Sequence, residues 1–183
     1  MSQPRAVFLD RDGVLNRAIV REGKPYPPAC RQEMELVMDA ASCLERLKDM
    51  GFQLIVVTNQ PDVARGTQKR EEVEAMHAWM QERLAVDEFR VCYHDDGEQC
   101  QCRKPKAGLL MEAMAEHGLD LARSYMVGDR WRDIDAGATA GCRTVWIDSN
   151  YNERGPSRPA DVRVKSLAEA VDWIYEQERK DHG

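Results

Sequence analysis

Short apolar runs alternate with amphipathic stretches along this chain. Five of the runs have the length of buried strands and are bounded by glycine or polar residues. They cover residues 6–9, 54–58, 89–92, 125–127 and 144–147. The spacing between successive runs leaves room for helices, so strands and helices are expected to alternate.

Apolar residues between these runs recur at three- and four-residue spacing, which predicts helices. Gly51, Gly118 and Gly141 each stand where such a helix would end, shortly before a strand candidate. Ser166 and Glu169 form a capping-box pattern at the start of the last helix. The predicted apolar helix faces are Leu44 and Leu47; Val73, His77, Met80 and Leu84; Leu110, Ala113 and Met114; and Leu167, Ala170, Val171 and Ile174.

This alternation predicts an α/β fold, a Rossmann-like three-layer sandwich with a mostly parallel central sheet. About 25 residues separate Gly13 from the first helix near Asp39, and the chain between Thr58 and Phe89 has room for one helix. A second folded domain usually needs about 50 residues or more. We therefore expect one domain over residues 1–183, with no separate cap domain and with loops around an open site. Residues 150–160 are expected to form a loose surface loop.

Composition narrows the class of protein. The chain has 183 residues and a net charge of −6, which argues against a general nucleic-acid surface. No apolar stretch approaches the roughly 18 residues that cross a bilayer, and the N-terminus lacks a signal-peptide pattern. We expect a cytoplasmic protein with no membrane or nucleic-acid partner, and a monomer is the expected form. Its six cysteines should be reduced or metal-bound.

Two aspartates follow the first apolar run, in the sequence Asp10-Arg11-Asp12-Gly13. In open α/β sheets, ligands bind at the carboxyl ends of the strands, so both carboxylates would face a crevice. Two carboxylates held close together repel each other and need a cation or a proton between them. An isolated match of this kind would more often be a polar turn.

Three further segments end or flank predicted strands. Each has an ordinary explanation by itself, as turn chemistry or a solvated charge run. A parallel sheet would bring all of them to the edge that carries Asp10 and Asp12, where a hydroxyl, an ammonium and a third carboxylate would converge on one site. The segments are Thr58-Asn59-Gln60, the basic cluster from Cys102 to Lys106, and the run from Met126 to Asp133 with Gly128-Asp129.

These motifs, in this order and spacing, resemble the haloacid dehalogenase superfamily of phosphatases over essentially the whole chain. The resemblance implies that Asp10 is the nucleophile and Asp12 the general acid and base. It also implies a Mg²⁺ ion held by Asp10, Asp129 and the backbone carbonyl of Asp12. Thr58 and Lys104 would grip the phosphoryl oxygens.

The chemistry agrees with that assignment. A carboxylate attacks a phosphate dianion poorly because like charges repel, and Mg²⁺ with an ammonium group reduces this repulsion. The first step needs Asp10 ionised and Asp12 protonated, so the two environments should separate their pKa values. Asp133 is expected to orient Lys104 or the water ligands of the ion, or to be a first-turn acid of a helix.

A second group of candidate ligands lies in the loop of about residues 92–102. Tetrahedral Zn²⁺ bound by three thiolates and one imidazole fits the spacing C-x-H…C-x-C, and four protein ligands indicate a structural site. Residues 95–99 are too polar to pack, so the ion would replace a hydrophobic core for this loop and would direct the cations that follow it, Arg103 and Lys104. The candidate ligands are Cys92, His94, Cys100 and Cys102.

The zinc loop running into Cys102-Arg103-Lys104-Pro105 resembles one branch of the superfamily, which holds heptose bisphosphate and histidinol-phosphate phosphatases. In the heptose enzymes, the positions of Arg103 and Arg130 contact substrate, and the match at residues 58–60 adds Asn59 and Gln60 as candidate substrate-binding residues. This chain departs from them at residues 61–63, which read Pro-Asp-Val, and its zinc loop is short, closer to the histidinol branch.

Four functions therefore compete. A small sugar phosphate, such as the 7-phosphate of a manno-heptose bisphosphate, is favoured because Arg103, Arg130 and Arg132 suit a second anionic group. Histidinol phosphate would want an acidic pocket. A phospho-accepting signalling domain is disfavoured because Asp12 supplies a base for hydrolysis, and a zinc module for nucleic acid is disfavoured by the net charge.

Overall fold

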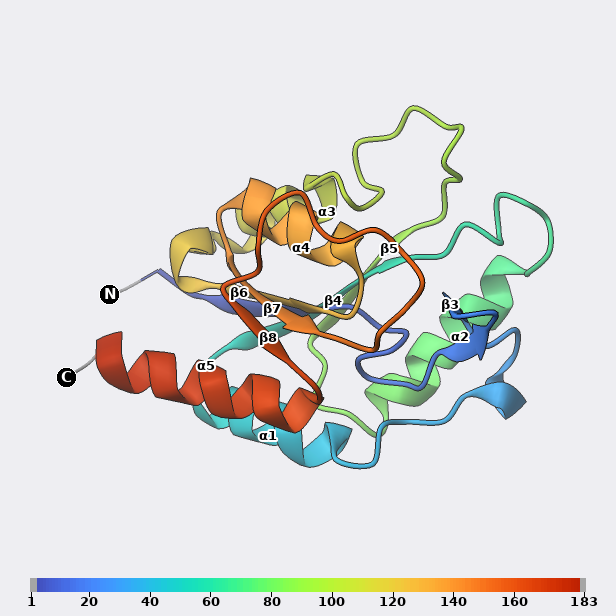
Figure 1. The fold of residues 1–183 in the computed structure, drawn as a ribbon. Helices are drawn as coiled ribbons and strands as arrows, with labels where there is room; N and C mark the ends of the chain where they lie inside the picture. The colour runs from blue at the N-terminus through green and yellow to red at the C-terminus, as the bar shows by residue number, and fades with distance from the viewer. Residues whose placement is uncertain (1–2, 182–183) are drawn as a thin grey trace.

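The structure, a computed structural model, describes residues 3–181 and is built around a six-stranded sheet (Figure 1). All neighbouring strands of this sheet are parallel, in the order β5-β4-β1-β6-β7-β8. The five predicted strands are confirmed, and β8 was not predicted because three residues are too few to show a pattern. The strands are β1 (Ala6–Leu9), β4 (Gln53–Asn59), β5 (Glu88–Cys92), β6 (Tyr125–Gly128), β7 (Arg143–Ile147) and β8 (Val162–Val164).

Helices cover both faces of the sheet, which confirms the predicted three layers (Figure 1). Strand β1 shows why: Val7 and Leu9 pack into the core under α1, α2 and α5, whereas Ala6 and Phe8 pack into the core under α3 and α4. The helices are α1 (Ala40–Asp49), α2 (Arg70–Gln81), α3 (Gly108–His117), α4 (Trp131–Ala140) and α5 (Leu167–Asp181), with short 3-10 turns η1 (Arg31–Glu33) and η2 (Leu121–Arg123).

Two predicted details of the helices are wrong in part. Leu84 is buried but lies beyond α2, which ends at Gln81 because the backbone then turns. At the start of α5, the Ser166 hydroxyl accepts a hydrogen bond from the N–H of Glu169 (3.2 Å), as a capping box requires. The Glu169 carboxylate instead accepts from the N–H of Lys165 (2.9 Å), one residue earlier than predicted.

The order of the strands places a crevice at the carboxyl end of β1. The chain moves outward from β1 to β4 and β5, and then returns to place β6 on the other side of β1. Side chains that follow β1, β4 and β6 therefore meet at the point where the strand order reverses.

The segment between Gly13 and α1 contains a small antiparallel hairpin that was expected only as loop. Its strands are β2 (Ile19–Arg21) and β3 (Lys24–Tyr26), and β3 is labelled in Figure 1. Lys24, Pro25 and Tyr26 line the cavity at the sheet edge, so this hairpin forms part of its rim. Among residues 3–181, no helix combines the length and the apolar character needed to span a bilayer.

Candidate active site

The carboxyl ends of β1, β4 and β6 bring the predicted site residues together. Asp10 directly follows β1, Asp129 directly follows β6, and Lys104 reaches the same place from the loop before α3. A cavity of about 250 Å³ opens here. The predicted residues that line it are Asp10, Asp12, Thr58, Asn59, Arg103, Lys104, Arg130 and Asp133. Asp129 borders an adjoining cavity of about 280 Å³.

Lys104 is buried between two carboxylates. Its ammonium donates to Asp10 Oδ1 (2.8 Å), Asp133 Oδ1 (2.7 Å) and the backbone carbonyl of Val57 (2.7 Å), which uses all three of its protons. Burial by itself would lower the pKa of Lys104, but Asp10 and Asp133 raise it above its ordinary value. Lys104 is therefore a fixed positive charge beside Asp10.

Asn59 holds the backbone of Lys104 from both sides. Its side-chain amide donates to the Lys104 carbonyl (3.0 Å), and its side-chain oxygen accepts from the Lys104 N–H (3.1 Å). The expectation was that Asn59 contacts substrate. In the structure its amide group is instead engaged in placing Lys104 at the sheet edge.

Asp10, Asp129 and Asp133 crowd one another. One carboxylate oxygen of each lies within 4.8 Å of the others. Burial and the Asp133 carboxylate raise the pKa of Asp10 to about 6, and burial and the Asp10 carboxylate raise the pKa of Asp129 well above its usual range. Oδ1 of Asp129 is buried and has no hydrogen-bond partner among the described residues. Such a group is stabilised by a cation or a proton.

Gly13 lets the backbone pass directly against Asp129. A Cβ at this position would lie 1.8 Å from Asp129 Oδ2, and the φ of +84° is a conformation that favours glycine. The chain therefore turns sharply after β1, and the physical reason for a glycine here is the close approach of a carboxylate that follows β6.

Asp12 lies among hydrogen-bond donors rather than among carboxylates. It accepts from Arg11 Nη2 (2.9 Å), Asn16 Nδ2 (3.0 Å) and Gln60 Nε2 (2.9 Å). Burial by itself would raise the pKa of Asp12, but Arg11 and the hydrogen bonds lower it below its ordinary value. The two aspartates do have different environments, as expected, but Asp12 is the one stabilised as an anion, the reverse of the predicted order.

Gln60 is placed differently from the prediction. It is fully buried and does not line the cavity, so it cannot touch a substrate from this position. Its side-chain amide donates to Asp12 and to the Thr58 hydroxyl (3.0 Å). Thr58 accepts this bond and retains its own hydroxyl proton for a ligand in the cavity.

Asp133 combines the two roles that were left open for it. Oδ1 accepts from Lys104, and Oδ2 accepts from the backbone N–H of Arg130 (3.0 Å) at the first turn of α4. It therefore orients Lys104 and caps the helix with the same carboxylate.

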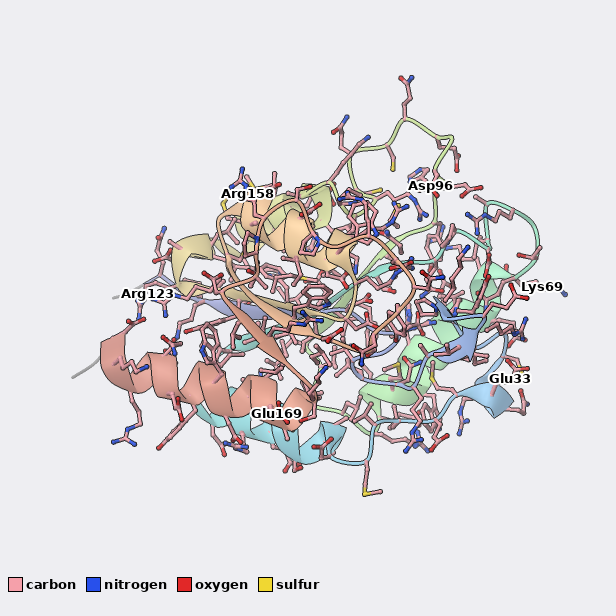
Figure 2. The ribbon with its side chains drawn as sticks, in the orientation of Figure 1. Glu33, Lys69, Asp96, Arg123, Arg158 and Glu169 are labelled. Atoms are coloured by element: carbon pink, nitrogen blue, oxygen red, sulfur yellow. The ribbon has the colours of Figure 1, made fainter. Side chains whose placement is uncertain are left out.

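The arginines at the rim are each paired with a carboxylate. Arg103 donates to Asp96 (2.8 Å), a residue of the long loop between β5 and α3 that is labelled in Figure 2. Arg132 also donates to Asp96 (3.2 Å), and Arg130 forms a two-pronged ion pair with Glu153. These three arginines were expected to suit a second anionic group of the substrate, but each is already paired with a carboxylate.

Three contacts of the site were not found from the sequence. They involve Arg11, Tyr151 and Glu153. Residues 150–160 form a surface loop without helix or strand, as expected, but the Tyr151 hydroxyl donates to Asp129 Oδ2 (2.7 Å), so the loop is tied to the site at this point. The contact of Arg11 could have been predicted, because a charged residue stands directly between two aspartates at a strand end. The contacts of Tyr151 and Glu153 could not, because their partners lie more than twenty positions away in the chain.

The four candidate zinc ligands also come together. Their ligand atoms all lie within 4.8 Å of one another, with Cys92 at the end of β5 and the rest on the loop that follows. Cys102 Sγ lies 3.2 Å from both Cys92 Sγ and His94 Nδ1, and the three cysteines form no disulfide bond.

The fold and the site define a hydrolase of the haloacid dehalogenase (HAD) class, and the family model described as HAD-hydrolase-like matches residues 101–170. A curated D-glycero-beta-D-manno-heptose-1,7-bisphosphate 7-phosphatase from Helicobacter pylori is 31% identical over 178 residues, 93% of this chain and 97% of the relative. A relative of the same name from Yersinia pestis is 40% identical over 151 residues, 76% of this chain and 77% of the relative. The chain belongs to this family of heptose bisphosphate phosphatases.

A solved structure agrees over nearly the whole chain. The crystal structure of the D,D-heptose 1,7-bisphosphate phosphatase from B. bronchiseptica, complexed with magnesium and phosphate, matches with a TM-score of 0.82 at 26% identity. The match covers 94% of this chain and 99% of the other.

Proposed function

We propose that this chain is a Mg²⁺-dependent phosphatase that removes the 7-phosphate from D-glycero-D-manno-heptose 1,7-bisphosphate. One observation carries the chemistry: the carboxylates of Asp10 and Asp129 meet in a buried cluster beside Lys104, and Asp129 Oδ1 has no partner within the described chain. The substrate rests on the names of relatives that are 31% and 40% identical.

The donor set fits a hard cation. Asp10, Asp129 and the backbone carbonyl of Asp12 are the proposed ligands, all oxygen donors of the kind that Mg²⁺ prefers. Asp133 is not a proposed ligand, because its two oxygens accept hydrogen bonds from Lys104 and from the N–H of Arg130. When bound, Mg²⁺ would neutralise the approaching phosphate and relieve the repulsion among the carboxylates.

Asp10 would attack phosphorus in line with the leaving oxygen of the sugar. An Asp10 oxygen–phosphorus bond forms as the bond from phosphorus to the sugar oxygen breaks, and Lys104 compensates charge beside the reacting carboxylate. Thr58 would donate its hydroxyl proton to a phosphoryl oxygen.

Asp12 would pass a proton in both halves of the reaction. An incoming phosphate dianion disfavours the anion of Asp12, and so promotes the protonated form that gives its proton to the sugar oxygen. The resulting carboxylate, held by Arg11 and Gln60, then takes a proton from the water that hydrolyses the aspartyl-phosphate.

For the second cluster we propose a structural Zn²⁺ ion bound by Cys92, His94, Cys100 and Cys102. The donor set of three sulfur atoms and one imidazole nitrogen favours zinc. Arg103 follows the last ligand and donates to the carbonyl of His94 (3.2 Å), so the loop and this rim arginine are linked.

The assignment of the nucleophile is tested with Asp10→Asn, measured by phosphate release from the heptose bisphosphate. We expect a loss of roughly 10³-fold or more in kcat, as is found when a nucleophile is removed. Asp49→Asn, an exposed position at the end of α1, is the matched control and should keep the parent rate. An Asp10→Asn variant that works at the parent rate would remove Asp10 from the mechanism.

Histidinol phosphate remains a second candidate substrate because of one feature of the rim. Asp62, Asp96 and Glu153 all line the cavity, and carboxylates suit the ammonium group of that compound. The two substrates differ in charge where they meet the rim, so their relative kcat/KM values separate the two proposals.

A further inference from the structure

The connection between β7 and β8 contributes a side chain to the proposed metal site. We propose that Tyr151 is a positioning residue that fixes the carboxylate of Asp129, so that one defined oxygen, Oδ1, faces the cation. The inference rests on the proposed Mg²⁺ site and concerns a residue far from the sequence motifs that define it.

The two oxygens of Asp129 have different surroundings. Oδ2 accepts the hydrogen bond from the Tyr151 hydroxyl at 2.7 Å, whereas Oδ1 is buried with no partner among the described residues. A carboxylate is symmetric, and rotation about its bond to Cβ would exchange the two oxygens. The Tyr151 hydroxyl makes the two oxygens inequivalent, because it holds one of them in a hydrogen bond and leaves the other to bind the cation.

The backbone around Asp129 is held as well. Trp146 Nε1 donates to the Asp129 carbonyl (3.2 Å), and Gly13 passes so close that a Cβ there would overlap Oδ2 and reach within 3.0 Å of the Tyr151 hydroxyl. Asp129, Tyr151 and Gly13 therefore form one packed contact, in which the carboxylate has little freedom to turn.

Tyr151 is itself anchored by the two residues that follow it in sequence. The next residue, Asn152, donates its N–H to the carbonyl of Gly23 (2.8 Å) at the tip of the β2–β3 hairpin, and Glu153 pairs with Arg130 beside Asp129. Figure 1 shows this connection reaching from the sheet toward the hairpin. The phenol is thus delivered to Asp129 by a segment that is tied at two further points, so its position is defined before any ligand binds.

A purely packing role for Tyr151 predicts that phenylalanine would serve equally well. The test is therefore Tyr151→Phe in the full chain, with Mg²⁺ affinity measured by titration calorimetry. We expect the Kd for Mg²⁺ to rise about tenfold, the low end of the effect of losing an outer partner of a metal ligand. Thermal unfolding without metal should be nearly unchanged, which separates ligand orientation from folding.

Two further variants make the outcome decisive. Tyr175→Phe, on the exposed side of α5, is the matched loss of a hydroxyl and should leave the Kd unchanged. Asp129→Asn should abolish measurable Mg²⁺ binding. If Asp129→Asn abolishes binding and Tyr151→Phe binds Mg²⁺ within twofold of the parent, the role of Tyr151 is overturned and the metal site stands. If Asp129→Asn binds Mg²⁺ normally, the proposed site fails and the inference fails with it.

Discussion

At the scale of single residues, the neighbours of Asp10 and Asp12 give two identical side chains different chemistry. Asp10 faces other carboxylates, and burial raises its pKa to about 6 with Asp133 adding to the effect. Asp12 faces Arg11 and two amide donors, which lower its pKa against the effect of burial. The residue type does not determine the role of either aspartate; the charge of the groups packed against it does.

The ammonium of Lys104 is expected to be required for folding as well as for catalysis. Lys104→Met would leave Asp10 and Asp133 buried without their shared cation, which typically costs about 3–5 kcal/mol for a broken buried pair. Urea unfolding should show that loss, and phosphate release should fall with it. Lys69→Met, at an exposed position before α2, is the control. Equal stability of Lys104→Met and the parent would contradict the buried ion pairs.

His77 predicts a pH dependence of stability. It is buried against Phe89 and contacts Arg11 (3.1 Å between Nη1 and Nε2), and burial followed by the Arg11 charge lowers its pKa from 6.5 to about 3. Below pH 6.5 the unfolded chain binds a proton that the folded chain does not, so this contribution is present above pH 6.5 and is lost as the pH falls toward 3.

The size of the loss is about 1.4 kcal/mol per pH unit in that window, and so about 2 kcal/mol between pH 7.5 and pH 5. His77→Gln keeps an acceptor for Arg11 and does not titrate. We expect its free energy of unfolding to fall less than that of the parent between these pH values. Parallel profiles for the two proteins would show that His77 is protonated in the folded chain.

Residues next to strand ends, and loop residues within a recognisable motif, could be predicted, whereas contacts made by the β7–β8 connection could not. Asp10, Thr58 and Asp129 follow apolar runs, and a parallel sheet brings such positions together whatever the loops do. Tyr151 acts through a hydrogen bond to Asp129, 22 positions earlier in the chain, and nothing in its local sequence records that contact. Asp96 and Glu153, the carboxylate partners of the rim arginines, were not predicted for the same reason: nothing in their local sequence indicates these contacts.

At the scale of elements, close packing of α4 on β6 sets the distance between Asp129 and Asp133. Gly137 in α4 allows it, because a Cβ there would lie 2.5 Å from Cβ of Met126 in β6. Gly137→Ala would force the two elements apart at a cost of about 1–3 kcal/mol, and the better helix propensity of alanine returns up to about 1 kcal/mol.

We therefore expect Gly137→Ala to lose about 1–2 kcal/mol of unfolding free energy, measured by urea titration. Gly97→Ala is the control, since a Cβ at Gly97 meets nothing within 4 Å. A Gly137→Ala protein as stable as the parent would show that α4 can shift on β6 without strain.

The loop of the proposed zinc site is expected to act on the substrate through Arg103. Cys100→Ser should reduce bound zinc from about one ion per chain to a small fraction, measured by atomic absorption. It should also raise KM more than it lowers kcat, because Arg103 is held by the loop through Asp96 and the carbonyl of His94. Cys30→Ser, outside the cluster, should change neither. A parent protein purified without zinc would refute the site.

Element prediction succeeded where apolar residues form a run or a periodic pattern, and failed where they do not. Strands β1 and β6 are fully buried, so their apolar runs are unambiguous. The strands of the β2–β3 hairpin are only partly buried and contain Pro25, which gives no periodic pattern. The hairpin turns at Glu22 and Gly23, which both have positive φ, and its tip accepts a hydrogen bond from the N–H of Asn152, a tertiary contact that local sequence does not encode.

At the scale of the whole molecule, the strand order assembles the site from distant segments of the chain. Asp10 and Asp129 lie on neighbouring strands although β4, β5 and three helices separate them in sequence. The rim is contributed by the hairpin, the loop of the proposed zinc site and the β7–β8 connection, so we expect these segments to set specificity while the proposed nucleophile follows a strand of the sheet.

The charge pattern of this assembled rim decides between the candidate substrates. In our proposal the bisphosphate would place a second phosphate where Arg103 and Arg130 now pair with Asp96 and Glu153, and a planar guanidinium binds phosphate with two parallel hydrogen bonds. Histidinol phosphate would instead place its ammonium near those carboxylates. Charge-assisted hydrogen bonds contribute about 1.5–3 kcal/mol, so we expect kcat/KM for the bisphosphate to be higher by about 10- to 100-fold.

The variant Glu153→Gln tests whether the charge of the rim distinguishes the two substrates. The variant weakens the pairing that a phosphate must displace from Arg130, so KM for the bisphosphate should fall. For histidinol phosphate the variant removes a carboxylate that would attract the ammonium, so KM should rise. Opposite shifts of the two KM values identify Arg130 as the phosphate contact. If both values shift in the same direction, Glu153 acts on the cavity as a whole, and the rim does not distinguish the substrates by charge.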